Sequence, residues 1–550
     1  MRLGAYAARS CPVKTQWDVI RPCEPAPDPP FLVELGRRGV DFEADVFAEL
    51  VTLHPDATVI DRTAPREERE RRTREALDAG ARLVLGPRLP HDPASGRVGE
   101  PDLLVHAGTT GYLPVDVKHH RTLDDEGTDL RGVLALVALG HDPMPVRPKD
   151  AGEGGSERGD LLQLAHYWRM LEDLRLASDM GPRGAIVGRE RVVVGYDLTE
   201  PRFNGGAGTG GREGPLGLYD VEYAERHRIA TAAAALLAEP DGEPPIAPVW
   251  FSECPNCRWR EHCGEMLEER QDVSLLPRVG RPAWEALRRI DADTIPALAA
   301  LPTSQAVEGM TTSALTKASE HARARVGAEV AYRRPGVERV TVERADVELD
   351  VDMENVEEGA YLWGVHVTDR TGSGIVTDGY QAFVDWDADA AVAGGRAFGD
   401  FWAWLSDVRR DCARRGVNLR AFCWHAPAEN RWLRAGASAL GLDDEVDAFI
   451  ASEEWVDLLR VFDAQLITGR ASGLKVVAPL LGFAWEDDDP SGAASMLWWQ
   501  QAVDAQRGTE EREEARARLL AYNADDVRAT LHVRDWMERN GSSVPELPGL

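Results

Sequence analysis

Long apolar runs are absent from this sequence of 550 residues. No stretch of about eighteen apolar residues occurs, which excludes an ordinary transmembrane helix. The opening segment MRLGAYAARSCPVKTQWD also lacks the apolar core of a signal peptide. Cysteine is scarce and odd in number, at seven, which argues against a disulfide scaffold. We therefore expect a cytoplasmic protein with no membrane partner.

Positive charge is also in short supply. Lysine and arginine together number 63 against 93 acidic residues, which gives a net charge of −30. Non-specific attraction to nucleic acid should therefore be weak over most of the surface. Only five of the basic residues are lysine, and two of these, Lys118 and Lys475, fall in the regions described below. Any nucleic-acid binding must be local, with metal ions offsetting carboxylate repulsion.

A carboxylate and a lysine stand close together in the motif Asp116-Val117-Lys118, within a segment expected to be a strand. Side chains alternate between the faces of a strand, so Asp116 and Lys118 point the same way. The carboxylate could hold a cation. The ammonium could hold a phosphate or polarise a water molecule.

The segments around this motif predict an αβββαβ order of elements. In that order, Glu43, Asp102 and Asp116 could converge as oxygen ligands for Mg²⁺ or Mn²⁺. Gln163 and Tyr167 are four residues apart and so share one helix face. The expected elements are a helix at 38–51, strands at 81–89, 97–108 and 111–120, a helix at 161–174 and a strand at 184–198.

This set of residues resembles the motifs of RecB-like PD-(D/E)XK nucleases. The resemblance implies a restriction-endonuclease-like core that hydrolyses DNA phosphodiester bonds with a bound metal ion. It implies that Lys118 positions water and stabilises developing charge, and that Gln163 and Tyr167 support the site and contact substrate. The matching residues are Glu43, Pro101-Asp102, Asp116 to Lys118, and Gln163 with Tyr167 in QLAHY.

Three cysteines cluster in one short run, CPNCRWREHC at 254–263. In a cytosolic protein such a cluster more often binds metal than forms disulfides. A tetrahedral or cubane site needs a fourth ligand. One interpretation is a structural zinc site. The candidates for the fourth ligand are Cys11, Cys23 and His262.

RecB-like nucleases of the iron–sulfur type are similar, because one cysteine precedes their nuclease core and three follow it. The resemblance implies a [4Fe–4S] cluster, and zinc remains the alternative. Cys412 and Cys423 fall in a later region, where we expect ordinary buried thiols. The cluster ligands implied by the resemblance are Cys11, Cys254, Cys257 and Cys263.

Beyond the cysteines, residues 272–301 pair two short apolar-periodic segments across a Pro-Arg-Val-Gly turn and resemble a helix-hairpin-helix unit. In such a unit backbone N–H groups contact a DNA phosphate without reading bases. The alternative is a helical linker that packs between domains. Residues 303–342 are polar and are expected to be a connector.

A second acidic set follows. Residues 346–355 predict a strand on which Asp352 and Glu354 share a face, and 361–369 predict its partner strand. Tyr522 and Asp526 are four residues apart on a predicted helix, so both can face that strand. A further carboxylate could come from either of two residues, Glu429 or Asp457.

The second set resembles the DEDDy exonuclease branch of the ribonuclease H-like fold. Asp352-Met-Glu354 matches the first motif and Tyr522-x-x-x-Asp526 the last, while Glu429 stands where an aspartate is usual. The resemblance implies two cations at the scissile phosphate and a tyrosine that orients water. The alternative is an inactive domain that only binds nucleic acid.

The predicted chain is thus an α/β multidomain nuclease that cleaves single-stranded DNA or DNA ends, in DNA repair or in defence against foreign DNA. The competing hypothesis is a nucleic-acid-binding scaffold with a structural metal cluster, which acts with a helicase. The predicted domains are a nuclease with its cysteine cluster at 1–266, a helix-hairpin-helix-like segment at 267–302, a linker at 303–342 and a ribonuclease H-like domain at 343–550.

Overall fold

The computed structural model describes residues 2–122, 156–189, 191–204, 211–238, 242–302, 304–487 and 491–549. The chain divides into two compact units. The amino-terminal unit comprises Met1–Pro248 and Glu253–His262, and the carboxy-terminal unit comprises Val249–Ser252 and Cys263–Leu550. Each unit is described by itself.

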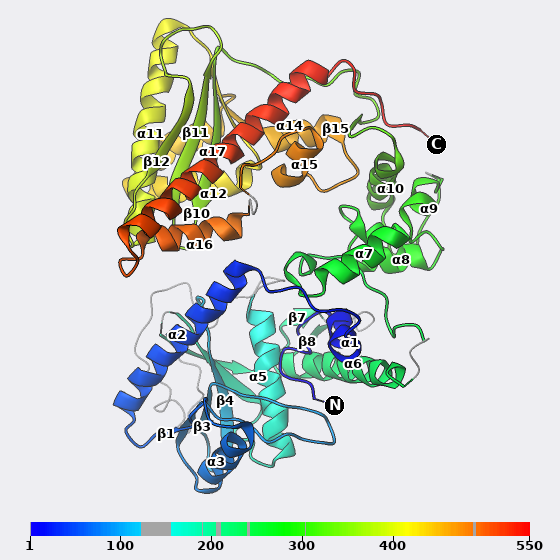
Figure 1. Ribbon diagram of the computed structural model, residues 1–550, viewed down its shortest axis with the longest axis vertical. Helices are drawn as coiled ribbons and strands as arrows, with labels where there is room; N and C mark the ends of the chain where they lie inside the picture. Colours follow the sequence, from blue (N-terminus) through cyan, green and yellow to red (C-terminus); the bar gives the residue numbers. More distant parts are fainter. Residues whose placement is uncertain are drawn as a thin grey trace. The chain divides into compact units, whose positions relative to one another are not determined.

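The amino-terminal unit is built on a six-stranded sheet in the order β1-β2-β3-β4-β5-β6 (Figure 1). The β1/β2 and β4/β5 pairs are parallel and the other pairs are antiparallel. Its strands are β1 (Thr58–Val59), β2 (Leu83–Leu85), β3 (Leu103–His106), β4 (Tyr112–Val117), β5 (Arg183–Val187) and β6 (Val193–Asp197), with the short pair β7 (Phe203–Asn204) and β8 (Arg212–Glu213). Its helices are α1 (Pro12–Ile20), α2 (Pro30–Leu53), α3 (Arg66–Asp78), α5 (Ser156–Asp173), α6 (Pro215–Leu236) and the 3₁₀ turn η1 (Cys254–Asn256).

Local sequence explains where several of these elements begin. Helices α1, α2 and α6 each start at a proline, whose fixed φ suits the first turn and whose missing N–H is not needed there. Every residue of β2 and β4 is buried. The single strand expected at 184–198 is wrong, because β5 and β6 are two antiparallel strands. The chain reverses between them, where Arg191 adopts the left-handed region with φ 57°.

The carboxy-terminal unit contains a five-stranded mixed sheet in the order β12-β11-β10-β13-β14. The β12/β11 and β11/β10 pairs are antiparallel, whereas β10, β13 and β14 run parallel. The strands are β10 (Val347–Asn355), β11 (Ala360–Asp369), β12 (Gly379–Val384), β13 (Leu419–Cys423) and β14 (Trp455–Asp457), with the short pair β9 (Tyr332–Arg333) and β15 (Leu466–Ile467).

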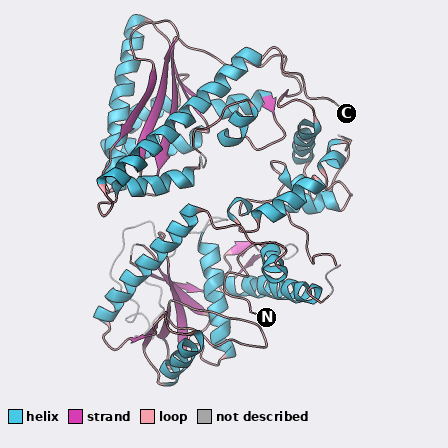
Figure 2. Ribbon diagram, viewed as in Figure 1, coloured by secondary structure: helices cyan, strands magenta, loops and turns pink. Residues whose placement is uncertain are grey.

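Helices cover both faces of this sheet (Figure 2). On one face, Phe398 and Phe401 of α11 pack with Leu349 of β10 in a single apolar core. The long helix α17 lies across the other face, in contact with β10 and β11. These helices are α11 (Ala390–Arg415), α12 (Ala426–Leu440), α13 (Asp443–Ile450), α14 (Leu458–Gln465), α15 (Leu474–Leu480), α16 (Gly492–Val503) and α17 (Thr509–Asn540).

A smaller helical cluster precedes this sheet in the same unit. Trp284, Leu298 and Leu315 come from three different helices and share one apolar core. The third of these helices lies within 303–342, so the segment expected to be a connector also contributes to a packed body. In the described part of the chain, no helix is long and apolar enough to cross a membrane. The helices of this region are α7 (Arg260–Arg270), the 3₁₀ turn η2 (Val273–Leu275), α8 (Arg281–Arg288), α9 (Ile295–Ala299) and α10 (Thr312–Val326).

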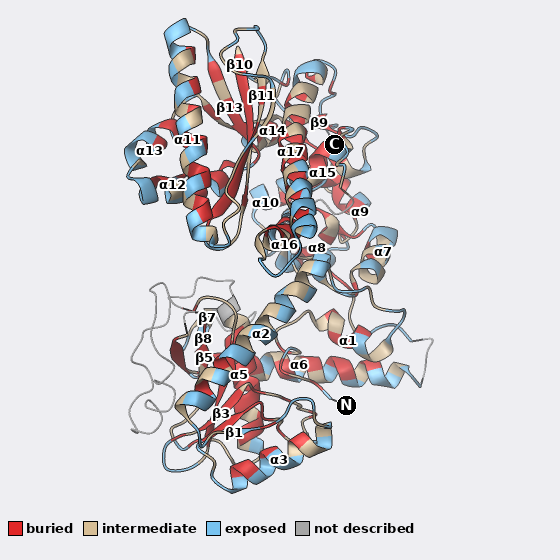
Figure 3. Cartoon of the chain, turned by 60° about the vertical axis from the view of Figure 1, so that its left-hand side comes forward, coloured by how far each residue is buried: buried red, intermediate tan, exposed pale blue. Residues whose placement is uncertain are grey.

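Burial follows the sheets of each unit, and the outward faces of the covering helices are exposed (Figure 3). Carboxylates depart from that pattern. Asp116 in β4 and Glu348, Asp350 and Glu354 in β10 are all buried. A buried charge is costly unless it is paired or coordinated, so each of these groups needs a partner.

Candidate metal and nuclease sites

Five of the six residues predicted for the amino-terminal site form one continuous chain of contacts. Lys118 Nζ lies 3.2 Å from Asp116 Oδ2 and donates to Gln163 Oε1 at 3.1 Å. Gln163 Nε2 donates in turn to the Tyr167 hydroxyl at 3.0 Å. Asp102 Oδ2 accepts at 2.8 Å from the backbone amide of Val117, the residue after Asp116. This hydrogen bond holds the Asp102 side chain against β4, the strand that carries Asp116.

The sixth residue, Glu43 in α2, reaches the others through a residue that the sequence did not indicate. Arg62 donates to Glu43 Oε2 at 2.8 Å and to Asp102 Oδ1 at 2.9 Å. Its guanidinium therefore stands between two of the three carboxylates expected to share a metal ion. Nothing in the local sequence around Arg62 marks it, because the contact depends on how α2 and β1 are placed.

A second unpredicted basic residue reaches the same site. Arg9, two residues before Cys11, donates to Gln163 Oε1 at 3.1 Å, the atom that also accepts from Lys118. Arg9 and Lys118 are therefore held close together around one neutral oxygen. Two cations so placed can bind one anion, such as a phosphate.

Burial shapes the electrostatics of this site. Removal from water raises the pKa of Asp102 to about 6, and the charge of Glu43 adds to the effect. Burial likewise raises the pKa of Asp116 to about 6, although the Lys118 ammonium acts in the opposite direction. A bound cation would favour the ionised form of both groups.

The predicted cluster cysteines lie just before α1 and in the run after α6. The Cys11 amide donates to Glu253 Oε2 at 3.2 Å, next to Cys254 in the sequence. Burial raises the pKa of the Cys11 thiol, with smaller contributions from Glu253 and Cys257. Cys23, another candidate for the fourth ligand, is exposed.

In the carboxy-terminal unit, four carboxylates alternate along β10. Glu348, Asp350, Asp352 and Glu354 fall on every second residue and so share the face covered by α17. The apolar residues between them, such as Leu349, belong to the core on the other face. One face of this strand therefore carries four acidic groups, of which Asp352 is partly exposed and the other three are buried.

Arginine neutralises the first two of these carboxylates. Arg534 of α17 donates to Asp350 at 2.6 Å and 3.3 Å and also pairs with Glu348. Arg344 donates to both oxygens of Glu348, at 2.7 Å and 2.8 Å. Arg534, Glu348 and Asp350 are fully buried and satisfy one another. This end of the strand is a closed ion-pair network.

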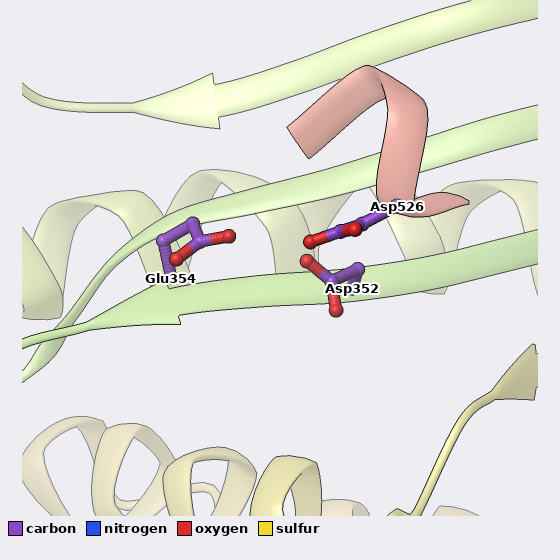
Figure 4. A group of neighbouring side chains, drawn as sticks. All are labelled: Asp352, Glu354 and Asp526. Carbon is purple, nitrogen blue, oxygen red and sulfur yellow. The ribbon is translucent and has the colours of Figure 1, made fainter. Parts of the chain in front are cut away.

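The other two carboxylates meet a third acid instead of an arginine. Asp352 and Glu354 project from β10 toward Asp526 of α17 (Figure 4). Among the described residues these three are the one group of His, Cys, Asp or Glu side chains whose ligand atoms all lie within 4.8 Å of one another. Within those same residues, neither the amino-terminal carboxylates nor the cysteines form such a group.

Protonation of this acidic group responds to its crowding. Burial raises the pKa of Asp352 well above its usual range, and the charges of Asp526, Glu354 and Glu429 add to the rise. Burial and the charge of Asp526 raise the pKa of Glu354 in the same way. A bound divalent cation would counter both shifts by favouring the ionised carboxylates.

Lys475 brings an ammonium into this site, whereas the sequence placed it in the region without giving it a role. Its Nζ donates to both oxygens of Asp526 at 2.9 Å and to the Tyr522 hydroxyl at 2.7 Å. Trp485 Nε1 also donates to Asp526, at 2.7 Å. Tyr522 and Asp526 are thus joined by a single cation, as their spacing on one helix face permits.

The two candidates for the further carboxylate, Glu429 and Asp457, have different surroundings in the structure. Asp457 accepts from the Arg460 amide at 3.1 Å and so caps α14. Glu429, in the first turn of α12, is buried, and within the described chain its Oε2 has no hydrogen-bond partner. Burial raises the pKa of Glu429 to about 8. Its charge in turn raises the pKa of Asp352, so Glu429 lies near the acidic group with an oxygen to offer it.

Both of the later cysteines are buried, as expected. Cys423 ends β13, where burial raises the pKa of its thiol and the charges of Glu429, Asp457 and Asp352 raise it further. A thiol with so high a pKa stays protonated and is a poor nucleophile or metal ligand.

One family model matches part of the carboxy-terminal unit. Residues 433–538 match the RNase_H_2 model, described as RNase_H superfamily. This region is RNase H-like. No curated protein and no solved structure matches the chain.

The matched region contains Lys475, Tyr522 and Asp526, while Asp352 and Glu354 lie on β10, ahead of it. The mixed sheet joins both parts, because β10 pairs in parallel with β13, and β13 with β14. The RNase H-like domain therefore assembles its acidic group from segments far apart in the sequence. The match and the acidic group together suggest nucleic-acid processing with a divalent metal ion.

Proposed function

We propose that this chain is a metal-dependent nuclease whose RNase H-like domain hydrolyses phosphodiester bonds. The proposed active site is formed by Asp352, Glu354, Asp526 and Glu429. One observation carries the proposal. Of four carboxylates along one face of β10, arginines neutralise the first two, and the last two converge on Asp526. Along this face of β10, the carboxylates that no arginine neutralises are therefore confined to one end of the strand. A divalent cation could bind there.

The donor set fits Mg²⁺ or Mn²⁺. All the proposed ligands are carboxylate oxygens, which hard cations prefer, and the buried Glu429 Oε2 has no other partner among the described residues. A bound cation would polarise the scissile phosphate and lower the pKa of a water nucleophile. Asp352 and Glu354 would hold it from the strand side, and Asp526 from the helix side.

The other groups of the site position atoms around the reaction. Lys475 donates to the Tyr522 oxygen, so the hydroxyl hydrogen of Tyr522 points away from the ammonium, toward Asp526 or a water molecule. The same ammonium donates to both carboxylate oxygens of Asp526 and so orients the side chain. Tyr522 then orients the attacking water, and Lys475 stabilises charge that develops on the phosphate.

We propose that the amino-terminal unit is a RecB-like PD-(D/E)XK nuclease domain, which cleaves single-stranded DNA or DNA ends. The chain of contacts that links Asp102 and Asp116 through Lys118 to Gln163 supports this proposal. In this assignment Lys118 and Arg9 bind phosphate together. DNA processing in repair is the proposed physiological role, with defence against foreign DNA as the alternative.

One observation favours a different role for that unit. Arg62 already compensates Glu43 and Asp102, which leaves less need for a metal ion there. The second candidate function is therefore a scaffold, in which the amino-terminal unit binds DNA without cleaving it. In that case the chain would act together with a helicase. Metal binding would require Arg62 to move away from the carboxylates.

We propose a [4Fe–4S] cluster on Cys11, Cys254, Cys257 and Cys263, with zinc as the alternative. The hydrogen bond from the Cys11 amide to Glu253, next to Cys254 in the sequence, supports this proposal because it joins the segments that carry these two cysteines. Anaerobic purification distinguishes the two cofactors. A broad absorbance near ~400 nm with bound iron supports the cluster, and stoichiometric zinc without iron contradicts it.

Two alanine variants of the full chain test the nuclease proposal. Asp352→Ala and Asp116→Ala are assayed with Mg²⁺ and with Mn²⁺ on labelled single-stranded DNA, duplex DNA and an RNA–DNA hybrid. Exposed acids of the same two units serve as matched controls, namely Asp407→Ala and Asp41→Ala, whose side chains are 71% and 61% exposed.

We expect Asp352→Ala to abolish cleavage of at least one substrate and both controls to behave as wild type. Loss of all activity in Asp116→Ala alone would reverse the roles of the two units. A wild-type chain that cleaves none of the three substrates with either metal would overturn the nuclease proposal.

A further inference from the structure

The side-chain amide of Asn523, from helix α17, occupies the space beside Asp352. Gly364 of β11 stands directly opposite Asp352 in the antiparallel pair, where a side chain would lie next to that of Asp352. A Cβ at this glycine would collide with Oδ1 of Asn523. The strand therefore omits a side chain at the place where α17 inserts Asn523.

Asn523 is fully buried, and both ends of its amide are used. Its Nδ2 donates to Asp352 Oδ2 at 2.8 Å, and its Oδ1 accepts from the Tyr380 hydroxyl at 2.8 Å. Because the Tyr380 hydroxyl donates to the amide oxygen, the carbonyl end faces Tyr380 and the NH₂ end faces Asp352. The tyrosine thus fixes which way the amide points.

We propose that Asn523, locked by Tyr380 in the space that Gly364 leaves open, is a positioning residue that holds Asp352 as a metal ligand. The inference rests on the metal centre proposed above. Because Oδ2 of Asp352 is occupied by the amide, its other oxygen is presented to the cation.

Asn523 lies behind the proposed metal ligands and is not one of them. Such outer partners orient ligand oxygens, and their loss typically weakens metal binding by about tenfold to a hundredfold. In the described part of the structure, no hydrogen bond joins Asn523 to the Lys475 ammonium. Its effect should therefore appear in metal affinity more strongly than in turnover at saturating metal.

The experiment measures Mn²⁺ binding by electron paramagnetic resonance in the full chain carrying Asp116→Asn, so that the amino-terminal carboxylates contribute little. Into this parent we introduce Asn523→Ala or Gly364→Ala, each expected to weaken Mn²⁺ binding about tenfold to a hundredfold. Gly364→Ala changes no polar group and acts by displacing the amide, with a smaller steric effect on the Tyr380 ring. Tyr380→Phe should weaken binding less, because the amide keeps its place but loses its orientation.

Gly395→Ala is the matched control, since a Cβ there meets nothing within 4 Å. It should leave Mn²⁺ binding unchanged. Cleavage by Asn523→Ala, assayed without the Asp116 change, should recover at high Mg²⁺, whereas a misfolded variant would not recover. A cooperative unfolding transition in EDTA shows that each variant is folded.

Two outcomes would overturn the inference, and they are distinguishable. If Asp352→Asn abolishes Mn²⁺ binding but Asn523→Ala and Gly364→Ala leave the affinity unchanged, the positioning role alone is wrong. If Asp352→Asn has no effect on Mn²⁺ binding by the parent, both the proposed metal centre and this inference are wrong.

Discussion

At the scale of single residues, the decisive property of the carboxy-terminal site is which carboxylates have a fixed cation. The first two acids of β10 pair with Arg534, and Asp526 pairs with Lys475, while Asp352 and Glu354 accept from neutral side chains. Neutral hydrogen bonds orient a carboxylate but do not cancel its charge. The site is therefore organised and still short of positive charge, which is the condition for taking up a divalent ion.

Lys475 should matter to turnover. Lys475→Met removes the cation that joins Asp526 to Tyr522, so we expect a loss of about a hundredfold in kcat on the cleaved substrate. Lys475→Arg keeps the charge but changes the donor geometry and should restore only part of the rate. The exposed Lys317→Met serves as control. Wild-type kcat in Lys475→Met would contradict the role assigned to this ammonium.

Glu429 should make the stability of the metal-free protein depend on pH. Its pKa rises from 4.5 to about 8 in the folded chain, so above pH 4.5 the folded state holds a proton that the unfolded state releases. The stability that this proton confers is fully present below pH 4.5 and is lost as pH rises through 8. Unfolding temperatures measured in EDTA should therefore fall between about pH 6.5 and 8.

Asp102 and Asp116 contribute little to the slope in this pH range, because both have pKa values of about 6 and have already lost most of their protons there. Glu429→Gln should flatten the slope without abolishing it, because Asp352 and Glu354 titrate in the same direction. Added Mn²⁺ should raise the unfolding temperature more at the upper end of the window, where these acids are ionised. An identical slope in Glu429→Gln would contradict the raised pKa.

At the scale of elements, β10 and α17 act as a matched pair. Arg534 closes one end of the pair, and the other end carries Tyr522, Asn523 and Asp526, about two to three helical turns earlier on the same helix. Burial of Arg534 between two carboxylates fixes the register of helix against strand. The proposed metal ligands are placed by that register.

Removing the buried arginine should therefore destabilise this pair. Arg534→Met leaves Glu348 and Asp350 buried with less compensation, which typically costs about 3–5 kcal/mol. Chemical denaturation of the full chain, followed by tryptophan fluorescence, measures the loss. Arg539→Met, on the exposed last turn of the same helix, should cost less than about 0.5 kcal/mol. Equal stabilities of the two variants would contradict the network's role.

Elements whose signal is local can be predicted from the sequence. The alternation in 346–355 and the apolar run in 361–369 predict β10 and β11, and the spacing of Tyr522 and Asp526 predicts their shared helix face. The pattern at 184–198 predicts one strand instead of two, because both halves are apolar and only a short turn at Arg191 separates them.

Contacts between distant segments cannot be predicted in this way. Arg62 reaches Asp102 across 40 positions, and Asn523 reaches Asp352 across 171. No local periodicity encodes such pairs. The position of Glu429 near Asp352 has the same origin, whereas the cap that Asp457 provides to α14 is a local contact. These contacts determine which acids remain available for metal.

At the scale of the whole molecule, a net charge of −30 makes local compensation essential. Nucleic acid should meet a mostly repulsive surface, so binding depends on the few positions where cations gather. Lys118 with Arg9 is one such position, and Lys475 beside a bound metal ion would be another.

Binding of single-stranded DNA should therefore depend on metal. A phosphorothioate single strand should bind weakly in EDTA, and its affinity should rise on the order of tenfold with Mn²⁺, because the cation offsets the carboxylate charge. Fluorescence anisotropy of the labelled strand measures the change. Equal affinity with and without metal would contradict the proposed role of the ion in substrate binding.

The most direct test of the proposed metal centre is the position of Mn²⁺ in crystals of the full chain, found from its anomalous scattering. We expect a peak among the carboxylates of Asp352, Glu354 and Asp526, and its loss in Asp352→Asn. Manganese found only at the amino-terminal carboxylates, or at no carboxylate of β10, would contradict the proposal.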